Sequence, residues 1–300
     1  MSTPPRVGVV IPSHNDLPTL RQAVASALAQ SLSAAEVIVV SDASDDGTDA
    51  WLALQAHAGV RFRSIDARSP AAARNVGVAM AKTPYVAFLD SDDVWDRDRL
   101  ALFALQLAKR PDGVLWACTW RREGLRLAPL PTPTWVDRHS RAVPAAAFLG
   151  MNRFQTSTVV VRREAILLAG GFNPEMDGAE DWDLWTRIAA RGRVWLTPAP
   201  LVTYRTGHGR VSSDGGRVYR QGLRMLMREG ADVRALAWHH LRFGYAFRRQ
   251  GAVALAAEAR AAMPTLHPLQ AVGLRLRFAL YLAARAWARS ALALQLALGR

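Results

Sequence analysis

Three carboxylates follow one apolar run in the segment Asp90-Ser91-Asp92-Asp93. Carboxylates one residue apart in a turn can converge on one hard cation, and Mg²⁺ and Mn²⁺ prefer such oxygen ligands while leaving positions for water and substrate phosphate. A divalent cation, Mn²⁺ or Mg²⁺, is therefore one interpretation of this segment. The other is helix capping, because these acids precede a helix expected from Arg97 to Lys109.

A second acidic group, Glu180-Asp181-Trp182-Asp183, opens another expected helix. Acids in a first helical turn suit the helix dipole, and this alone can explain their presence. One of them can instead project into a site as a general base, which requires a fixed position close to the hydroxyl whose proton it takes.

Single polar residues elsewhere are candidates for contacts with a nucleotide. Asp42 follows a second apolar run, where an acid can accept hydrogen bonds from a base or ribose or can close a turn of its own loop. The Arg74 side chain has two interpretations: it contacts an anionic or carbonyl group, or it points into solvent. His208 likewise is a surface residue or contacts a metal or a diphosphate. No G-x-G-x-x-G follows the first apolar run and no G-x-x-x-x-G-K-[ST] occurs, which disfavours dinucleotide oxidoreductases and P-loop enzymes.

The elements that must position these residues alternate between two periodicities over the first hundred residues. Short apolar runs predict buried strands, and apolar residues at helical spacing predict helices between them. This order predicts an α/β fold with a mostly parallel, doubly wound sheet, whose ligands bind beyond the carboxyl ends of the strands. The polar clusters after the first, second and fourth strands, at residues 12–16, 41–48 and 90–93, should therefore share one edge. The expected strands are 7–11, 37–40, 60–65 and 85–89, and the expected helices are 17–28, 47–57 and 70–82, the last capped by Ser69 with Pro70 at its first position.

The remainder of the chain is less regular. Residues 127–144 contain four prolines and predict a loop, whereas 156–162 and 194–196 predict strands and 182–190 a helix. From about Gly215 the chain is rich in Ala, Leu and Arg, and breaks near Gly230, Gly251 and Pro264 predict three or four helices.

Composition excludes several classes of protein. Half of the 300 residues are apolar, and the single cysteine, Cys118, excludes a disulfide framework and a multi-cysteine zinc site. The first residues hold no apolar signal core and no apolar stretch is long enough for a membrane span, so we expect a cytoplasmic protein. The formal charge of +13 is concentrated in residues 220–300, which carry 13 arginines and 3 acids.

Six motifs in order make the chain resemble the family 2 glycosyltransferases of GT-A fold, over about residues 5–212. Each motif is weak alone, but the ordered set is highly specific. The quoted residues are Val9-Val10-Ile11-Pro12 with the V-D-D-G-S-x-D-G-T-like segment Val40 to Thr48, Ala73-Arg74-Asn75-Val76-Gly77, Leu89-Asp90-Ser91-Asp92-Asp93, Gly170-Gly171-Phe172, Glu180-Asp181-Trp182-Asp183-Leu184 and Tyr204 to His208.

The resemblance implies an inverting, metal-dependent transfer of a sugar from a nucleotide-diphosphate sugar to an acceptor hydroxyl. It implies Asp181, with Glu180, as catalytic residues, Asp92 and His208 at the metal, and Trp182 either against an acceptor sugar or in the core. It implies contacts to the nucleotide from Pro12, His14, Asn15, Asp42, Arg74, Asp90 and Ser91. The family often has two adjacent acids after the second strand, and Ser41 stands in place of the first. Asp42 alone should then contact the base, and UDP is the favoured nucleotide on this weaker contact.

We expect a glycosyltransferase domain at residues 1–214, with a nucleotide half of about 1–110 and an acceptor half of about 111–214, and a helical appendage at 215–300. From the same resemblance we expect the acceptor to be a saccharide or a lipid-linked molecule, in bacterial cell-surface polysaccharide or glycoconjugate synthesis. The alternatives are a metal-dependent nucleotidyltransferase and an inactive sugar-nucleotide-binding module.

The basic C-terminal helices permit three interpretations: peripheral contact with the cytoplasmic face of a membrane, packing on the catalytic domain, or a dimer contact. On a helical wheel Arg275, Arg285 and Arg289 fall within about 80° of arc, whereas Arg277 lies apart. Aromatic residues are too sparse among these arginines for a nucleic-acid surface, so no nucleic-acid partner is expected.

Overall fold

The computed structural model describes residues 3–123, 131–205 and 214–297. The chain divides into two compact units, Met1–Phe148 with Asn152–His208, and Leu149–Met151 with Gly209–Arg300. Each unit is described by itself. The domain assignment expected from the sequence, with its boundary at residue 214, stays a prediction.

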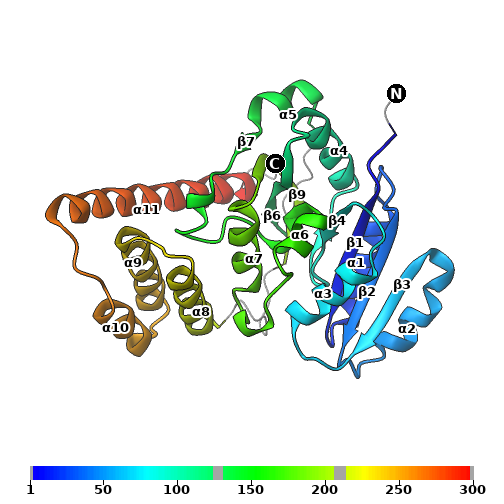
Figure 1. Ribbon diagram of the computed structural model, residues 1–300, viewed down its shortest axis with the longest axis horizontal. Coiled ribbons are helices and arrows are strands. Elements are labelled where there is room, and N and C mark those ends of the chain that lie inside the picture. The colour runs from blue at the N-terminus through cyan, green and yellow to red at the C-terminus, as the bar shows by residue number, and fades with distance from the viewer. Residues whose placement is uncertain (1–2, 124–130, 206–213, 298–300) are drawn as a thin grey trace. The chain divides into compact units, whose positions relative to one another are not determined.

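The first unit is built on a sheet whose described strands follow the order β3-β2-β1-β4-β8-β6-β9-β5, with β7 paired to β9 (Figure 1). Parallel pairing joins β1 to β2 and β4, and β2 to β3. This confirms the parallel core predicted from the alternating pattern. The strands are β1 (Val7–Ser13), β2 (Glu36–Asp42), β3 (Val60–Ile65), β4 (Tyr85–Phe88), β5 (Val94–Trp95), β6 (Gly113–Arg122), β7 (Arg141–Ala142), β8 (Val159–Arg162) and β9 (Arg193–Tyr204).

Two hydrophobic clusters cover the two faces of this sheet. Val9 and Ile11 of β1 belong to the cluster that contains α1 and α4, whereas Val10 belongs to the cluster that contains α3 and α7. Successive side chains of a strand point to opposite faces, so an unbroken apolar strand is buried on both sides. The helices are α1 (Leu17–Leu28), α2 (Thr48–Leu54), α3 (Pro70–Met80), α4 (Arg99–Lys109), α5 (Pro133–His139), α6 (Arg163–Leu168) and α7 (Glu180–Ala189).

Helix α3 begins where predicted and lies unusually close to the sheet. The Ser69 hydroxyl accepts a hydrogen bond from the backbone N–H of Ala72, and Pro70 occupies the first turn. A Cβ added to Gly77 would lie 2.3 Å from Cγ1 of Val10. The glycine therefore lets α3 approach β1, which brings Arg74 to the edge of the sheet.

Two expectations about the middle of the chain are wrong. The loop expected at 127–144 contains α5 and β7 in its described part. The Thr132 hydroxyl caps α5 by accepting a hydrogen bond from the backbone N–H of Trp135, and a proline in the first helical turn does not break a helix. Strand β9 runs through two prolines rather than ending at residue 196, since its pairing with β6 shifts register beside them. Strand β6 itself was not expected.

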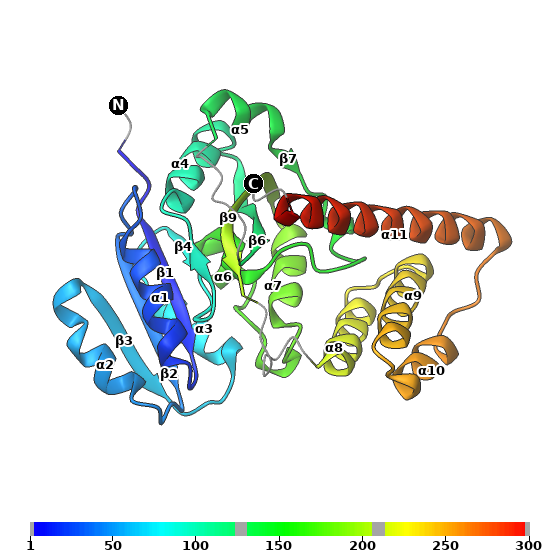
Figure 2. The same ribbon diagram turned by 180° about the vertical axis from the view of Figure 1, so that it is seen from behind.

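The second unit consists of α8 (Gly215–Arg228), α9 (Val233–Arg249), α10 (Val253–Ala261) and α11 (Pro268–Ala297), labelled in Figure 2. Gly230 and Gly251 have φ of +67° and +73° and separate the first three helices, as predicted. A small core gathers around Tyr219 and Phe247. None of the helices in the described part of the chain combines the length and apolar character needed to cross a bilayer.

Candidate functional site

The loops that follow β1 and β2 are joined by hydrogen bonds at the carboxyl edge of the sheet. Nδ1 of His14 donates to the carbonyl oxygen of Asp42 over 2.6 Å. The backbone of Asn15 donates to the Ser44 hydroxyl, and its side-chain oxygen accepts from the backbone of Asp45 at 2.8 Å. Two of the three predicted polar clusters therefore form one surface, in which His14 and Asn15 are exposed.

Asp16 connects this surface to the third cluster, after β4. Its carboxylate accepts hydrogen bonds from the hydroxyls of Ser13 and Ser91. Burial raises the pKa of Asp16, and the two serine hydroxyls partly offset that rise. Sequence reasoning placed Asp16 in the polar cluster but did not assign it this connecting role.

Backbone strain is concentrated at the same edge. Within the described residues, the non-glycine residues with positive φ are Asn15 (51°), Ala43 (52°) and Arg68 (49°). They follow β1, β2 and β3 in turn. Such conformations cost free energy and persist where surrounding contacts enforce them, which happens most often at functional sites.

Asp42 holds the loop that precedes α3. Its Oδ1 accepts from the backbone N–H groups of Ala67 and Arg68 at 2.7 and 2.8 Å, and its Oδ2 accepts from Ser69 at 2.6 Å. Three amide donors give the carboxylate an internal structural role. Its contact with a base or ribose stays a prediction, which has to use the remaining lone pairs.

Arg74 links the end of β4 to the start of α7. Its Nη2 donates to Oδ1 of Asp90 and its Nη1 donates to Oε1 of Glu180, each over 2.8 Å. Burial alone would lower the pKa of the Arg74 guanidinium, but the two carboxylates outweigh burial and raise it. The interpretation of Arg74 as a solvated helical residue is therefore wrong, because the side chain is buried between two acids that lie far apart in sequence.

Glu180 is occupied by this ion pair and by the backbone N–H of Gly178, which donates to Oε2 over 2.9 Å. It is buried and fixes the start of α7. This geometry gives Glu180 a positioning role beside the catalytic candidate that follows it.

Asp181 is held by neighbours that sequence reasoning missed. Its Oδ2 accepts from Nδ2 of Asn152 at 2.9 Å and from the Thr156 hydroxyl at 3.2 Å, and its Oδ1 accepts from the backbone N–H of Trp182. Burial, followed by the charge of Glu180, raises the pKa of Asp181 to about 6. A carboxylate with a pKa close to neutrality is a better proton acceptor than an ordinary aspartate. No local sequence pattern marks Asn152 or Thr156.

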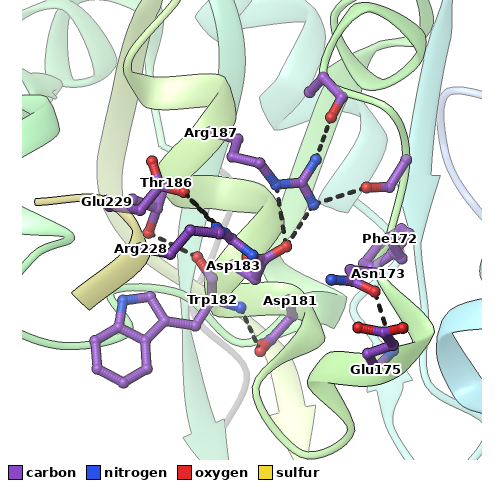
Figure 3. Close-up of polar contacts among 12 residues, drawn as sticks. Phe172, Asn173, Glu175, Asp181, Trp182, Asp183, Thr186, Arg187, Arg228 and Glu229 are labelled. Carbon is purple, nitrogen blue, oxygen red and sulfur yellow. Dashed lines mark hydrogen bonds and ion pairs between the residues drawn. The ribbon is translucent and has the colours of Figure 1, made fainter. Parts of the chain in front are cut away.

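Figure 3 shows how the rest of this acidic motif supports the helix. Arg187 donates to Oδ2 of Asp183 from Nε and Nη2 at 3.0 and 2.5 Å, and it also donates to the backbone carbonyls of Ala169 and Gly171. Asp183 is fully buried. The pair fixes α7 to the turn before Phe172.

Trp182 lies inside the protein in this conformation. Only 2% of it is exposed, and its Nε1 donates to the carbonyl oxygen of Phe148 over 2.6 Å. Of the two interpretations of Trp182, the geometry favours core packing over contact with an acceptor sugar.

The side chain of Asn75 joins α3 to the glycine turn before Phe172. Its side chain donates to the Phe172 carbonyl and accepts from the Phe172 N–H, both at 2.8 Å. Gly171 has φ of +74°, and an added Cβ would lie 2.7 Å from Oδ1 of Asn75. Neighbouring residues of α3 thus anchor two distant segments, with Arg74 reaching Glu180 and Asn75 reaching the glycine turn.

The acids after β4 divide into two groups. Asp93 is buried and accepts from the Ser157 hydroxyl at 2.6 Å, and the same hydroxyl accepts from the backbone N–H of Asp90 at 3.0 Å. Asp90 and Asp92 are only half-buried, in the turn above. None of these acids caps α4, which begins after Asp98.

The described residues contain no group of three or more His, Cys, Asp or Glu side chains that could hold a metal ion. The half-buried carboxylates of Asp90 and Asp92 are of the ligand type that Mg²⁺ or Mn²⁺ prefers, and such a cation takes one or two protein carboxylates and completes its shell with phosphate and water, although Oδ1 of Asp90 is already paired with Arg74. His208, the other expected metal contact, lies outside the described residues.

Comparison with protein families and curated proteins gives consistent results. Residues 8–167 match the model described as "Glycosyl transferase family 2", and residues 139–240 match "Glycosyltransferase like family 2". A pre-mycofactocin glycosyltransferase of Mycobacterium tuberculosis is 31% identical over 66% of this chain and 42% of its own length. The succinoglycan biosynthesis protein ExoU of Rhizobium meliloti is 31% identical over 64% of this chain and 59% of its own length. This chain therefore spans less than two thirds of either relative.

Solved structures show the same fold at low sequence identity. S. aureus TarS 1-349 in complex with UDP-GlcNAc superposes with a TM-score of 0.65 at 17% identity, covering 86% of this chain and 82% of that one. The mannosyltransferase PcManGT of Pyrobaculum calidifontis, in complex with GDP-Man and Mn²⁺, gives a TM-score of 0.62 at 24% identity, covering 95% and 84%. The predicted GT-A-like α/β fold with C-terminal helices is thereby confirmed.

Proposed function

Since the chain belongs to glycosyl transferase family 2, we propose that it transfers a sugar from a nucleotide-diphosphate sugar to an acceptor hydroxyl, with inversion at the anomeric carbon. The observation that carries this proposal is the bridge from Arg74 to Asp90 and Glu180. It joins the strand end expected to face the diphosphate to the helix that carries Asp181.

The donor would bind at the carboxyl edge of the parallel strands. Asp42 at the end of β2 and Arg74 in α3 would support the nucleotide, and Asp90 and Ser91 would face its diphosphate. Pro12 lies near the end of β1, and the exposed residues His14 and Asn15 of the loop that follows offer further contacts. Glu180 holds Arg74 in place.

The transfer itself would be a direct displacement. The acceptor oxygen forms a bond to the anomeric carbon while the bond from that carbon to the diphosphate oxygen breaks, and the nucleoside diphosphate leaves with the bonding electrons. Asp181 takes the proton of the attacking hydroxyl. Its pKa of about 6 leaves it ionised at neutral pH and still basic enough for the task.

A divalent cation held by Asp92, with Asp90 beside it, would stabilise the charge of the departing diphosphate as a Lewis acid. His208 is the further proposed contact to this cation or to the diphosphate. Arg74 contributes fixed positive charge next to Asp90.

The substrates are proposed at the level of class. The names of the relatives include succinoglycan biosynthesis, which supports an acceptor in bacterial cell-surface polysaccharide or glycoconjugate synthesis. UDP is the favoured nucleotide from the sequence, while the two structural neighbours carry UDP-GlcNAc and GDP-Man. A panel of nucleotide sugars tested by thermal shift with Mn²⁺ would identify the donor, since a ligand stabilises the folded state that binds it.

The decisive experiment is Asp181→Asn. We expect donor binding to be retained and transfer to fall by about 10²–10⁴-fold, the usual contribution of a general base. Glu164→Gln is the matched control, because Glu164 is an exposed carboxylate of α6 outside the site. Turnover close to that of the unmodified protein would remove Asp181 from the role.

The two alternatives make different predictions for the donor alone. With Mg²⁺ or Mn²⁺ and no acceptor, a glycosyltransferase slowly hydrolyses its sugar donor to nucleoside diphosphate and free sugar. An inactive binding module releases neither product, and a nucleotidyltransferase cleaves between the phosphates and releases a nucleoside monophosphate unit.

A further inference from the structure

In residues 268–284 of α11, whose side chains the structure describes, aromatic contacts join one face of the helix to its own unit. Phe278 and Tyr281 lie edge-on to the ring of Trp238 in α9, with ring centroids 6.1 and 5.5 Å away. Tyr245 makes a similar contact with Phe278 at 5.5 Å. These aromatic contacts account for the inward face of α11, which is the long helix of the second unit in Figures 1 and 2.

The outward face of α11 is apolar and exposed. Leu269, Val272, Leu276 and Leu280 have exposed fractions of 77%, 63%, 62% and 64%. At 100° per residue these four side chains fall within about 80° of arc, so they form one continuous stripe. Between and beside them, the exposed positions Gly273, Ala279 and Ala283 add no polar group.

Two arginines border this stripe, one on each side. Arg275 and Arg277 are both exposed and lie at opposite edges of the outward face, about 200° of arc apart with Leu276 near its middle. The guanidinium of Arg277 stacks 4.2 Å from the ring centre of Trp238, which fixes it at the boundary between the two faces. The separation of Arg277 from the other arginines on the helical wheel thus places a positive charge on the second side of the stripe.

We propose that the outward face of α11 binds the surface of an anionic lipid bilayer, with the leucine stripe at the acyl boundary and the flanking arginines at the headgroups. Helices with an apolar face bordered by basic residues lie in this way at membrane interfaces. Charge selects this partner over a second copy of the chain. Residues 220–300, which make up most of this unit, carry a net charge of +10, so two copies of the unit would repel each other, whereas anionic lipids attract it.

The test is flotation of the full-length protein with vesicles of phosphatidylcholine alone and with vesicles that also contain phosphatidylglycerol. We expect binding to the anionic vesicles only, weakening as salt is added. The double variant Leu276→Glu/Leu280→Glu should bind at least about tenfold more weakly, because it places charge in the apolar stripe. Arg275→Gln should bind about fivefold more weakly, since each basic residue near such a surface contributes about 1 kcal/mol.

The matched control is Leu54→Glu/Leu168→Glu, which makes the same chemical change at leucines of the first unit that are 67% and 70% exposed. This variant should float as the unmodified protein does. Thermal unfolding of both double variants should match the unmodified protein, because all four leucines are exposed. Equal flotation of the two double variants would overturn the proposal.

Two other results would also overturn it. One is equal binding of the unmodified protein to neutral and anionic vesicles. The other is a lipid-free dimer, detected by sedimentation, that Leu276→Glu/Leu280→Glu converts to monomer, since a second copy would then cover the stripe. Donor hydrolysis in solution measures the proposed function separately. Loss of vesicle binding therefore does not report on donor hydrolysis, and loss of donor hydrolysis does not report on vesicle binding.

Discussion

The amide of Asn152 donates a 2.9 Å hydrogen bond to Oδ2 of Asp181, and this bond lowers the carboxylate pKa against the opposing effect of burial. Asn152→Ala should therefore raise the pKa of Asp181 above its value of about 6. A general base works when ionised, so the acid limb of the pH profile of kcat/KM should move to higher pH. The measurement is that profile for both proteins.

Thr156→Val provides a graded control for this prediction. The Thr156 hydroxyl lies 3.2 Å from the same oxygen of Asp181, so its loss should shift the acid limb in the same direction but by less. An acid limb that stays in place, or moves to lower pH, in Asn152→Ala would contradict the assignment of Asp181 as base.

Asp92→Ala tests the proposed cation site. We expect donor affinity measured with Mn²⁺ to fall by at least about tenfold, toward the affinity measured with a chelator, because a divalent cation would no longer join the diphosphate to the protein. Titration calorimetry with and without metal gives both values. Glu164→Ala, an exposed acid of α6, should leave both unchanged. If Asp92→Ala retained the full difference between the two conditions, Asp92 would not be a metal ligand.

Local sequence was enough to predict the parallel core, because β1, β2 and β4 each contain an apolar run followed by polar residues, and β3 lies at the expected place between two predicted helices. Strand β6 was not predicted, and the two arginines at its end, Arg121 and Arg122, do not continue an apolar strand pattern. Arg121 is in fact buried in an ion pair with Asp96, a partner that the sequence does not identify. Burial of a charge depends on a distant opposite charge, so periodicity alone cannot reveal it.

The candidate site followed the same rule. The acids at the ends of β2 and β4 stand out because polar clusters after buried strands are unusual, and those at the start of α7 stand out because three acids fall in one helical turn. Their partners do not stand out: Asn152, Thr156 and Ser157 reach Asp181, Asp90 and Asp93 only through tertiary contacts. The structural role of Asp42 could not be predicted either, because the backbone amides that donate to its carboxylate carry no sequence signature.

Gly77→Ala tests the close approach of α3 to β1. The added methyl group would lie 2.3 and 3.1 Å from the two γ carbons of Val10, a β-branched side chain with little freedom to move. We expect a loss of about 1–3 kcal/mol in the free energy of unfolding. Gly273→Ala is the control, because nothing lies within 4 Å of its added Cβ and alanine favours the helix by about 1 kcal/mol. Chemical denaturation that found both variants equally stable would contradict this account of the packing.

Ala43→Gly tests the strain at the edge of the sheet. Ala43 has φ of +52°, a left-handed conformation that costs an alanine about 1–2 kcal/mol and a glycine almost nothing. The family motif that this segment resembles has glycine at the same place, so the chain retains the conformation without the residue that adopts it freely. We expect the variant to raise the free energy of unfolding by about 0.5–1 kcal/mol, the difference between relieved strain and the added freedom of glycine in the unfolded chain. Ala53→Gly, at an exposed position of α2 with ordinary helical backbone, should instead lower it by about 1 kcal/mol. Urea denaturation of the three proteins decides the matter: a decrease for Ala43→Gly similar to that for Ala53→Gly would show that the positive φ at residue 43 carries no strain.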